Sequence, residues 1–328
     1  MVIFELSQSA ENLTSHSGLA LFGAAFERSR LDQRVNPFKL PQAQQEPEIS
    51  HGDILKSYIG LLGLGQSDYE AIEPFRGDEL VFKLPLGLKA VPSSATLRQR
   101  MNHLAGMSEA SRLQTIIKEE SLALLKQAGA RLSPTLDELI PLDIDVSPFD
   151  NSKSHKEAVS RTYKGFDGYA PILAYLGQEG YMMNVELRPG KQHCQKETPA
   201  FLRDTLVLTR QLTAAGLLVR LDSGNDDGEN LSILTEAEKV DFIIKRNLRK
   251  ESKAKWLQRA KKHGQAEEVR PGKIVYRGDI RLTKYLTLKG EKVKCRIRCV
   301  FEVTERTITA TGQGLLVPEI EVDTYWTS

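Results

Sequence analysis

The sequence predicts an α/β protein with a helical N-terminal region, a central mixed sheet with helices, and a C-terminal antiparallel β-rich region. Apolar residues recur at helical spacing through residues 1–135. Strand-like and helical segments alternate through residues 136–250, which is typical of a sheet covered by helices. Residues 251–328 hold one basic helix, followed by segments with the two-residue period of strands. We expect these three ranges to be separate regions of the fold, whereas the length of 328 residues alone would suggest about two domains.

The N-terminal region is predicted to consist of several short helices. Apolar residues from Leu19 to Phe26 have helical spacing, and residues 54–64 and 108–128 show the same pattern. The polar residues 39–53 predict a linker or a long loop between the first two of these helices.

A further helix is predicted to begin after Pro92, where two serines provide a start signal. Leu97, Met101 and Leu104 form its apolar face. Arg98 and Arg100 are expected to point elsewhere. The two arginines are candidate DNA contacts if this helix belongs to a helix-turn-helix module. The residues alone favour an ordinary capped helix.

The central region is predicted to follow the order strand, strand, strand, helix, strand, helix, strand. Glycine and proline bound the predicted strands, and Thr198 with Pro199 marks the start of the first of these helices. The strands are expected at residues 141–150, 168–177, 180–190, 217–222 and 241–248, and the helices at residues 198–216 and 229–239.

A basic helix at residues 251–263 precedes the β-rich region. In the predicted strand at residues 291–303, the two-residue period places cysteines and apolar side chains on one face and cations on the other. The cationic face comprises Lys292, Lys294, Arg296 and Arg298. The other strands are expected at residues 273–283, 284–290, 306–312 and 314–326.

The formal net charge of +2 conceals a strong asymmetry. Residues 239–298 hold 20 Lys and Arg against 6 Asp and Glu, a local balance of +14. Such a block is expected of a protein that holds a phosphate backbone, and equally of a solvated face. It supplies further candidate DNA contacts: Lys245, Arg246, Arg249, Lys250, Lys253, Lys255, Arg259, Lys261 and Lys262.

The three cysteines indicate a reducing compartment. Cys194, Cys295 and Cys299 form no disulfide framework, and no second pair of suitable spacing completes a metal site with the last two. No apolar run approaches the roughly 18 residues of a membrane span, and residues 1–13 lack the pattern of a secretory signal. We therefore expect a cytoplasmic protein without a membrane partner.

Aspartates in apolar strands are the candidate catalytic residues. Asp143 and Asp145 lie in the first predicted strand of the central region, and Asp222 ends the fourth. In the strand order above, a ribonuclease-H-like sheet would place these two strands side by side, so that the carboxylates share one divalent cation. Oxygen ligands of this kind suit Mg²⁺ or Mn²⁺. Taken alone, the pattern favours the simpler interpretation that these aspartates cap turns.

Several stretches of the chain carry a family resemblance. LDIDVSPFDNSKSHKEAVSRTYKGFDGYAPILAYLGQEGYMMNVELRPGKQHCQKETPAFL, LLVRLDSGNDDGEN and FIIKRNLRKE closely resemble the DDE transposases of bacterial insertion sequences. HGDILKSYIGLLGLGQSDYEAIEPFRGDELVFKL and VPSSATLRQR are similar to the N-terminal region of that family. The resemblance covers nearly the whole chain, and the order and length of the blocks make it specific.

The resemblance implies a ribonuclease-H-like fold in which an Asp-Asp-Glu triad holds two metal ions, Mg²⁺ or Mn²⁺. By match to the family motif, the catalytic and metal-binding aspartates are Asp145, with Asp143 as the alternative, and Asp222. The implied partner is double-stranded DNA, both the terminal inverted repeats of the transposon and the target, which a dimer would hold in a synaptic complex near the bacterial nucleoid. The strand-rich region would be the β-rich insertion that precedes the glutamate.

The chain departs from the family pattern near its C-terminal end. The family's glutamate lies on a helix in the pattern Tyr, two residues, Arg, three residues, Glu, six residues, Lys, which does not occur here. We therefore expect a chain that is truncated before its last catalytic residue and is inactive alone. The predicted function is DNA cleavage and strand transfer at insertion-sequence ends. The alternatives are a non-catalytic DNA-binding protein that occupies transposon ends or inhibits the full-length enzyme, and a nuclease or resolvase.

Overall fold

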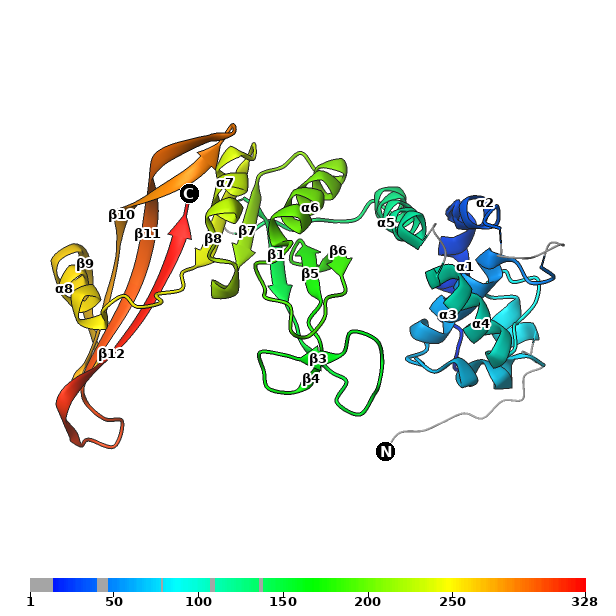
Figure 1. The fold of residues 1–328 in the computed structure, drawn as a ribbon, viewed down its shortest axis with the longest axis horizontal. Coiled ribbons are helices and arrows are strands. Elements are labelled where there is room, and N and C mark those ends of the chain that lie inside the picture. Colours follow the sequence, from blue (N-terminus) through cyan, green and yellow to red (C-terminus); the bar gives the residue numbers. More distant parts are fainter. Residues whose placement is uncertain (1–13, 40–46, 78, 107–109, 136–137) are drawn as a thin grey trace, which may run out of the picture. The chain divides into compact units, whose positions relative to one another are not determined.

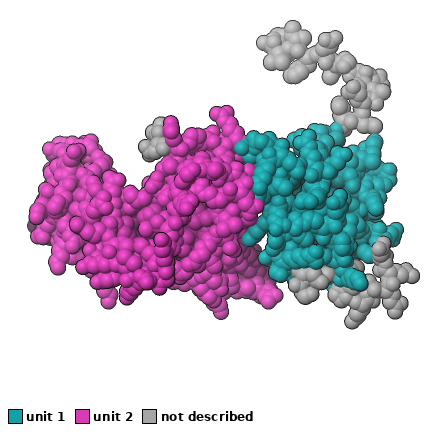
Figure 2. Space-filling model, turned by 90° about the horizontal axis from the view of Figure 1, so that it is seen from above, with its two compact units in different colours: residues 1–130 teal, residues 131–328 magenta. Residues whose placement is uncertain are grey.

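The computed structural model of the protein describes residues 14–39, 47–77, 79–106, 110–135 and 138–328 (Figure 1). It divides into two compact units, residues 1–130 and residues 131–328, which Figure 2 colours separately. Part of the predicted linker (residues 40–46) and the N-terminal segment inspected for a signal (residues 1–13) lie outside the described residues. In the part of the chain that is described, no helix is both long and apolar enough to cross a bilayer.

The first unit is helical, as its apolar spacing predicts. Helix α3 begins at His51 rather than at residue 54, because Ser50 Oγ accepts a hydrogen bond from Asp53 N–H at 3.0 Å and caps the helix. The unit comprises α1 (Leu19–Arg28), α2 (Leu31–Val35), α3 (His51–Gly63), η1 (Tyr69–Phe75), η2 (Glu79–Lys83), α4 (Ser94–Gly106) and α5 (Ala110–Gln127).

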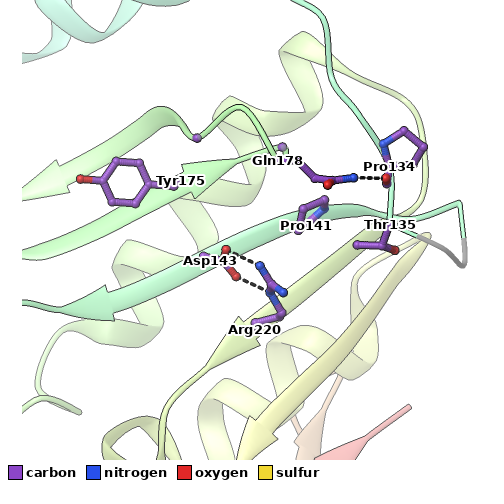
Figure 3. Close-up of a pocket in the computed structure, with 9 residues that line it drawn as sticks. Pro134, Thr135, Pro141, Asp143, Tyr175, Gln178 and Arg220 are labelled. Carbon is purple, nitrogen blue, oxygen red and sulfur yellow. Dashed lines mark hydrogen bonds and ion pairs between the residues drawn. The ribbon is translucent and has the colours of Figure 1, made fainter.

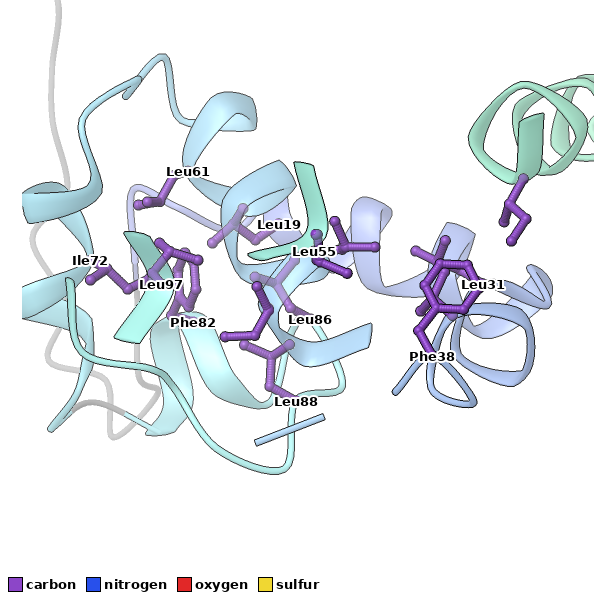
Figure 4. Close-up of a cluster of buried hydrophobic side chains, with 14 residues drawn as sticks. Leu19, Leu31, Phe38, Leu55, Leu61, Ile72, Phe82, Leu86, Leu88 and Leu97 are labelled. Carbon is purple, nitrogen blue, oxygen red and sulfur yellow. The ribbon is translucent and has the colours of Figure 1, made fainter. Parts of the chain in front are cut away.

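These helices share one cluster of buried aliphatic and aromatic side chains (Figure 4). Leu61 of α3 is fully buried, and Leu97 and Leu104 of α4 are at most 2% exposed, which confirms the predicted apolar face of α4. Helices of this length are marginal alone in water, so packing around the shared core stabilises them.

The second unit is built on a nine-stranded sheet with the order β6-β5-β1-β7-β8-β12-β11-β10-β9. Strands β1, β7 and β8 are parallel, whereas β5 is antiparallel to both β1 and β6. The first and fourth predicted strands of the central region are therefore neighbours, and the predicted α/β fold with a ribonuclease-H-like mixed sheet is confirmed. Its elements are β1 (Ile140–Val146), β5 (Ile172–Leu176), β6 (Tyr181–Glu186), α6 (Thr198–Leu212), β7 (Leu217–Leu221), η3 (Ser223–Asn225), α7 (Gly228–Glu236), β8 (Val240–Lys245), α8 (Lys253–His263), β9 (Gly264–Arg270), β10 (Lys273–Leu288), β11 (Glu291–Ile308) and β12 (Gly314–Thr327).

One face of the central strands is apolar and covered by helices. Leu142 and Ile144 of β1 share this face with Val219 of β7, and none of the three is more than 2% exposed. Helices α6 and α7 pack in this part of the unit through fully buried side chains such as Leu202 and Leu231. Because successive side chains on a strand alternate between faces, the polar residues of these strands lie together on the opposite face.

The strand boundaries depart from expectation in several places. The strand predicted at residues 306–312 is not a separate strand, because β11 continues to Ile308. The strand predicted at residues 168–177 is interrupted after Tyr169 and resumes at Ile172. The predicted first strand ends at Val146, and β2 (Phe149–Asp150) belongs to a separate small sheet with β3 (Ser160–Arg161) and β4 (Asp167–Tyr169). The two strands predicted at residues 273–290 form the single strand β10, which pairs without a break with β11. The chain reverses only at Lys289 and Gly290, where both residues have positive φ.

Strand β9 is missing from the sequence prediction. It lies at the edge of the sheet, and most of its side chains are exposed and polar, so it has no apolar alternation by which a strand is recognised. Strand β12 pairs with both β11 and β8, so the β-rich region (strands β9 to β12) and the central strands form one continuous sheet.

Candidate active site

The pairing of β1 with β7 brings Asp145 next to Asp222. Asp143 lies opposite Arg220 and Ile144 opposite Leu221 in this parallel pair, so the next step of the register places Asp145 beside Asp222. Neighbouring strands lie about 4.8 Å apart. Asp145 shares a face with Asp143, and Asp222 follows Arg220 onto that face. Two carboxylates that are 77 positions apart in the sequence therefore converge at the ends of adjacent strands.

The environment of Asp145 disfavours a bare negative charge. Its Oδ1 accepts a hydrogen bond from Val146 N–H at 2.8 Å. Although the residue reaches solvent, partial burial of its carboxyl group raises its pKa, and repulsion by Asp222 raises it further, against the opposing effects of that hydrogen bond and of Lys164. A cation placed between the two carboxylates would relieve both the burial and the repulsion.

The two carboxylate oxygens of Asp222 differ in their surroundings: one caps a turn, and the other is available to a ligand. It is the N-cap of η3, where its Oδ1 accepts hydrogen bonds from Gly224 N–H at 3.1 Å and from Asn225 Nδ2 at 2.7 Å. The turn-capping interpretation of the sequence is thus correct for this residue. Its Oδ2 has no hydrogen-bond partner within the described residues, and neither has Asp145 Oδ2. One oxygen of each carboxylate remains for a ligand, and hard oxygen donors of this kind fit Mg²⁺ or Mn²⁺.

Tyr163, which the sequence does not single out, lies in the turn between β3 and β4 and is 72% exposed. Partial burial of its hydroxyl raises the pKa of Tyr163, and the negative charges of Asp145 and Asp222 raise it further. The phenol therefore lies within the electrostatic reach of both carboxylates. The sequence analysis did not identify this residue, because it did not predict the small sheet of β2, β3 and β4 that places the turn of Tyr163.

Asp143, the alternative first aspartate, has a different partner. Figure 3 shows its carboxylate directed at the guanidinium of Arg220, which donates from Nε and Nη2 across the β1–β7 pair. This ion pair raises the pKa of Arg220. The pair lines a cavity of about 620 Å³ with residues such as Tyr175 and Gln178. Because Asp143 is already neutralised by Arg220, Asp145 is the better candidate ligand.

Two of the predicted DNA contacts are buried, and their placement corrects the prediction. Arg100 is 6% exposed, donates to Ile49 O at 2.9 Å and contacts His51 Nδ1 at 3.2 Å. Arg246 is 8% exposed and forms an ion pair with Glu251 at 2.6 Å. Both guanidinium groups have protein partners in the interior, so neither is available to a phosphate.

The cationic face predicted for β11 is present and is wider than expected. Arg298 forms an ion pair with Asp279 at 3.2 Å, and Arg281 of β10 lies opposite Arg298 on the same face. Lys292 Nζ lies 5.5 Å from the ring centroid of Tyr285, whose side chain is 60% exposed. We define the basic face as the four exposed cations of this surface that form no ion pair within the described residues, namely Arg281, Lys292, Lys294 and Arg296.

The other predicted DNA contacts are exposed, but three of them are ion-paired. Lys245 pairs with Asp323 at 2.7 Å, Lys261 with Glu305 at 2.8 Å, and Arg98 with Glu70. The remainder are Arg249, Lys250, Lys253, Lys255, Arg259 and Lys262. A cavity of about 400 Å³ that Arg259 lines together with Arg281 and Arg296 connects α8 to the basic face.

The raised pKa of Asp145 leads to a prediction about stability. We expect Asp145→Asn in metal-free buffer to raise the free energy of unfolding at neutral pH, because a carboxyl whose pKa is higher in the folded state destabilises the fold once ionised. The protonated carboxyl group of Asp145 does not destabilise the wild type at low pH. This favourable condition is lost as the pH rises through the folded-state pKa of Asp145. The gain should therefore be smallest below about pH 4 and grow above it.

Urea unfolding with EDTA over this pH range measures the effect. Asp143→Asn is the matched control with the opposite sign, because it leaves Arg220 without its partner. An Asp145→Asn variant that is less stable than the wild type at pH 7 would contradict the destabilisation attributed to burial of this carboxyl group and to repulsion by Asp222.

Comparison with known proteins identifies the family of this chain and similar solved structures. No curated protein sequence matches this chain. A solved structure similar to the chain is a piggyBac transposase synaptic complex with hairpin DNA, at 10% sequence identity and a TM-score of 0.36. The similarity covers 98% of this chain and 54% of that one, so the chain spans about half the length of that protein. The family profile of the transposase DDE domain, group 1, matches residues 4–285, which is most of the sequence, and the chain belongs to this family.

Proposed function

We propose that this chain is a DNA transposase in which Asp145 and Asp222 hold divalent metal ions for cleavage and strand transfer at the ends of an insertion sequence. The observation that supports this most directly is the convergence of the two aspartates from adjacent parallel strands, in a chain whose family is defined by a transposase DDE domain. Two bound Mg²⁺ or Mn²⁺ ions would stabilise the attacking and leaving oxygens of a phosphodiester.

The residues of the chain hold and position the DNA. Asp145 and Asp222 each present one oxygen without a hydrogen-bond partner among the described residues, on the face of the sheet that polar residues share. The basic face and the exposed cations of α8 would neutralise backbone phosphates and keep a duplex in register with the carboxylates. In-line positioning of the reacting groups contributes much of the acceleration in such reactions. The proposed substrates are double-stranded terminal repeats and target DNA, held by a dimer.

A second candidate is a non-catalytic DNA-binding protein that occupies transposon ends. One observation favours it: within the described residues, no group of three or more His, Cys, Asp or Glu side chains is arranged to hold a metal ion. Two carboxylates alone bind a metal ion more weakly than three. This candidate shares the DNA-binding surface and differs only in the chemistry.

One assay separates the two candidates. The full chain is mixed with a labelled duplex of the genomic DNA that flanks its coding sequence, in Mg²⁺, in Mn²⁺ or in EDTA. Metal-dependent cutting followed by joining to a second duplex is expected of the transposase, and a gel shift without cutting is expected of the second candidate. Cutting without joining would indicate a nuclease and overturn both, and so would the absence of binding.

A further inference from the structure

Asp226 is a buried carboxylate in the same loop as Asp222, and the proposed chemistry does not use it. Its side chain is only 4% exposed, and it directly follows η3, the short turn that Asp222 opens. A buried carboxylate is costly unless several partners compensate its charge. The partners of Asp226 show what this loop is attached to.

Three donors converge on Asp226 from distant parts of the unit. Lys284 Nζ of β10 lies 3.1 Å and Trp326 Nε1 of β12 lies 2.9 Å from Asp226 Oδ1. The N–H of Asn247, just after β8, donates to Asp226 Oδ2 at 3.0 Å. Burial alone would raise the pKa of Asp226, but the charge of Lys284 and these hydrogen bonds outweigh burial and hold the pKa below its usual value. The ionised carboxylate is thus strongly held by the β-rich region.

The same loop is also held from the other side. Cys194 Sγ donates to Gly224 O at 3.0 Å, and Gln195 Nε2 donates to Asp226 O at 3.3 Å. Asp222 itself binds Gly224 N–H through its Oδ1. Only the η3 turn separates the two aspartates, so a shift of Asp226 reaches Asp222 through a short and strongly hydrogen-bonded segment.

We propose that Asp226 is a positioning residue through which Lys284 and Trp326 of the β-rich region set the orientation of Asp222 toward its metal ions. The inference rests on the proposed function, because it assumes that Asp222 is a metal ligand. Lys284 lies on β10, whose opposite face carries Arg281 of the basic face. The strand that would meet DNA on one face therefore holds the catalytic loop on the other.

The chain offers a matched pair of tryptophans for the test. Trp326 is 2% exposed and donates to Asp226, whereas Trp256 is 0% exposed and donates to Glu251 at 2.8 Å. Both indoles stack with the guanidinium of Arg246, at 4.4 Å and 5.5 Å. Replacing either one by Phe removes one hydrogen bond from a buried indole to a carboxylate, but of the two only Trp326 donates to the loop of Asp222.

Mn²⁺ binding by the full chain is measured from the electron paramagnetic resonance signal of free Mn²⁺. Trp326→Phe and Lys284→Gln are expected to weaken Mn²⁺ affinity by about tenfold or more, the usual effect of losing a group that orients a metal ligand. Trp256→Phe should stay within about twofold of the wild type. Hydrogen exchange in the segment 221–231 should be faster in the first two variants and unchanged in the third.

Each outcome decides the inference. Unchanged Mn²⁺ affinity in Trp326→Phe and Lys284→Gln would overturn the positioning role while leaving the carboxylate pair intact. An equal loss in Trp256→Phe would overturn it too, since the cause would then be general destabilisation. If Trp326→Phe fails to fold, the partly exposed Lys284 decides alone. A wild-type chain that binds no Mn²⁺ would refute the carboxylate site of the proposed function, and the inference with it.

Discussion

Replacing Asp222 by Asn is expected to abolish metal-dependent cleavage and to leave DNA binding nearly unchanged. The asparagine keeps the Oδ1 acceptor that caps η3, so the loop should retain its hydrogen bond from Gly224 N–H. What disappears is the negative charge beside Asp145. Loss of about 4 kcal/mol of transition-state stabilisation corresponds to a fall of about a thousandfold in the cleavage rate. Mn²⁺ affinity of the chain should fall by more than about a hundredfold, beyond the effect of losing a group that only orients a ligand.

The measurements for this variant are the cleavage rate, Mn²⁺ affinity and a gel shift on the same duplex. Mn²⁺ affinity makes the prediction testable even if the wild-type chain only binds DNA. Asp143→Asn serves as the control on the same face of the sheet, because Asp143 is paired with Arg220 and should not contribute to metal binding. Equal loss of DNA binding and metal binding in Asp222→Asn would show that Asp222 is structural.

Neutralising the basic face should reduce the salt dependence of DNA binding more than any other surface change. In Arg281→Gln, Lys292→Gln, Lys294→Gln and Arg296→Gln combined, the slope of log affinity against log salt concentration should become less steep by about 3.6, at about 0.9 per lost phosphate contact. When the salt concentration rises from 50 to 200 mM, the DNA affinity of the wild type should therefore fall by about 150-fold more than that of this variant.

The control for this experiment uses cations that already have partners. Arg277 pairs with Glu267 and Glu302, and Arg298 pairs with Asp279, so Arg277→Gln with Arg298→Gln should change the slope much less. Fluorescence anisotropy of a labelled duplex at several salt concentrations provides the slopes. Similar slopes for the wild type and the fourfold variant would exclude the basic face as the site of phosphate contact.

The candidate site shows how much of an active site can be predicted from patterns in the sequence. Alternation of polar and apolar residues predicts the strands that contain Asp145 and Asp222, and the family motif singles out these two residues. The sequence leaves Asp143 open as the alternative, because both aspartates have the same two-residue pattern. The alternatives separate only when the register places Arg220 opposite Asp143.

The proposed DNA-binding surface shows a second limit of prediction from sequence. The cationic face of β11 can be predicted from the two-residue period of that strand. Arg281 lies on β10, and it joins this face only because β10 pairs with β11. Arg246 belongs to a basic block, yet it is buried between Trp256 and Trp326, which come from α8 and β12. Burial depends on which segments pack against a residue, and the residues adjacent to it in the sequence do not determine this packing.

Local patterning therefore identifies most helices, most strands and the basic block, whereas the two candidate ligands are identified by the family motif. Helical and strand periods are properties of a few consecutive residues, so a linear sequence displays them. Pairing between strands far apart along the chain decided that Asp145 meets Asp222, that Arg281 completes the basic face, and that Lys284 and Trp326 hold Asp226. Such contacts depend on the register and packing of the whole sheet, because the partner that compensates a buried charge comes from a segment far away in the sequence.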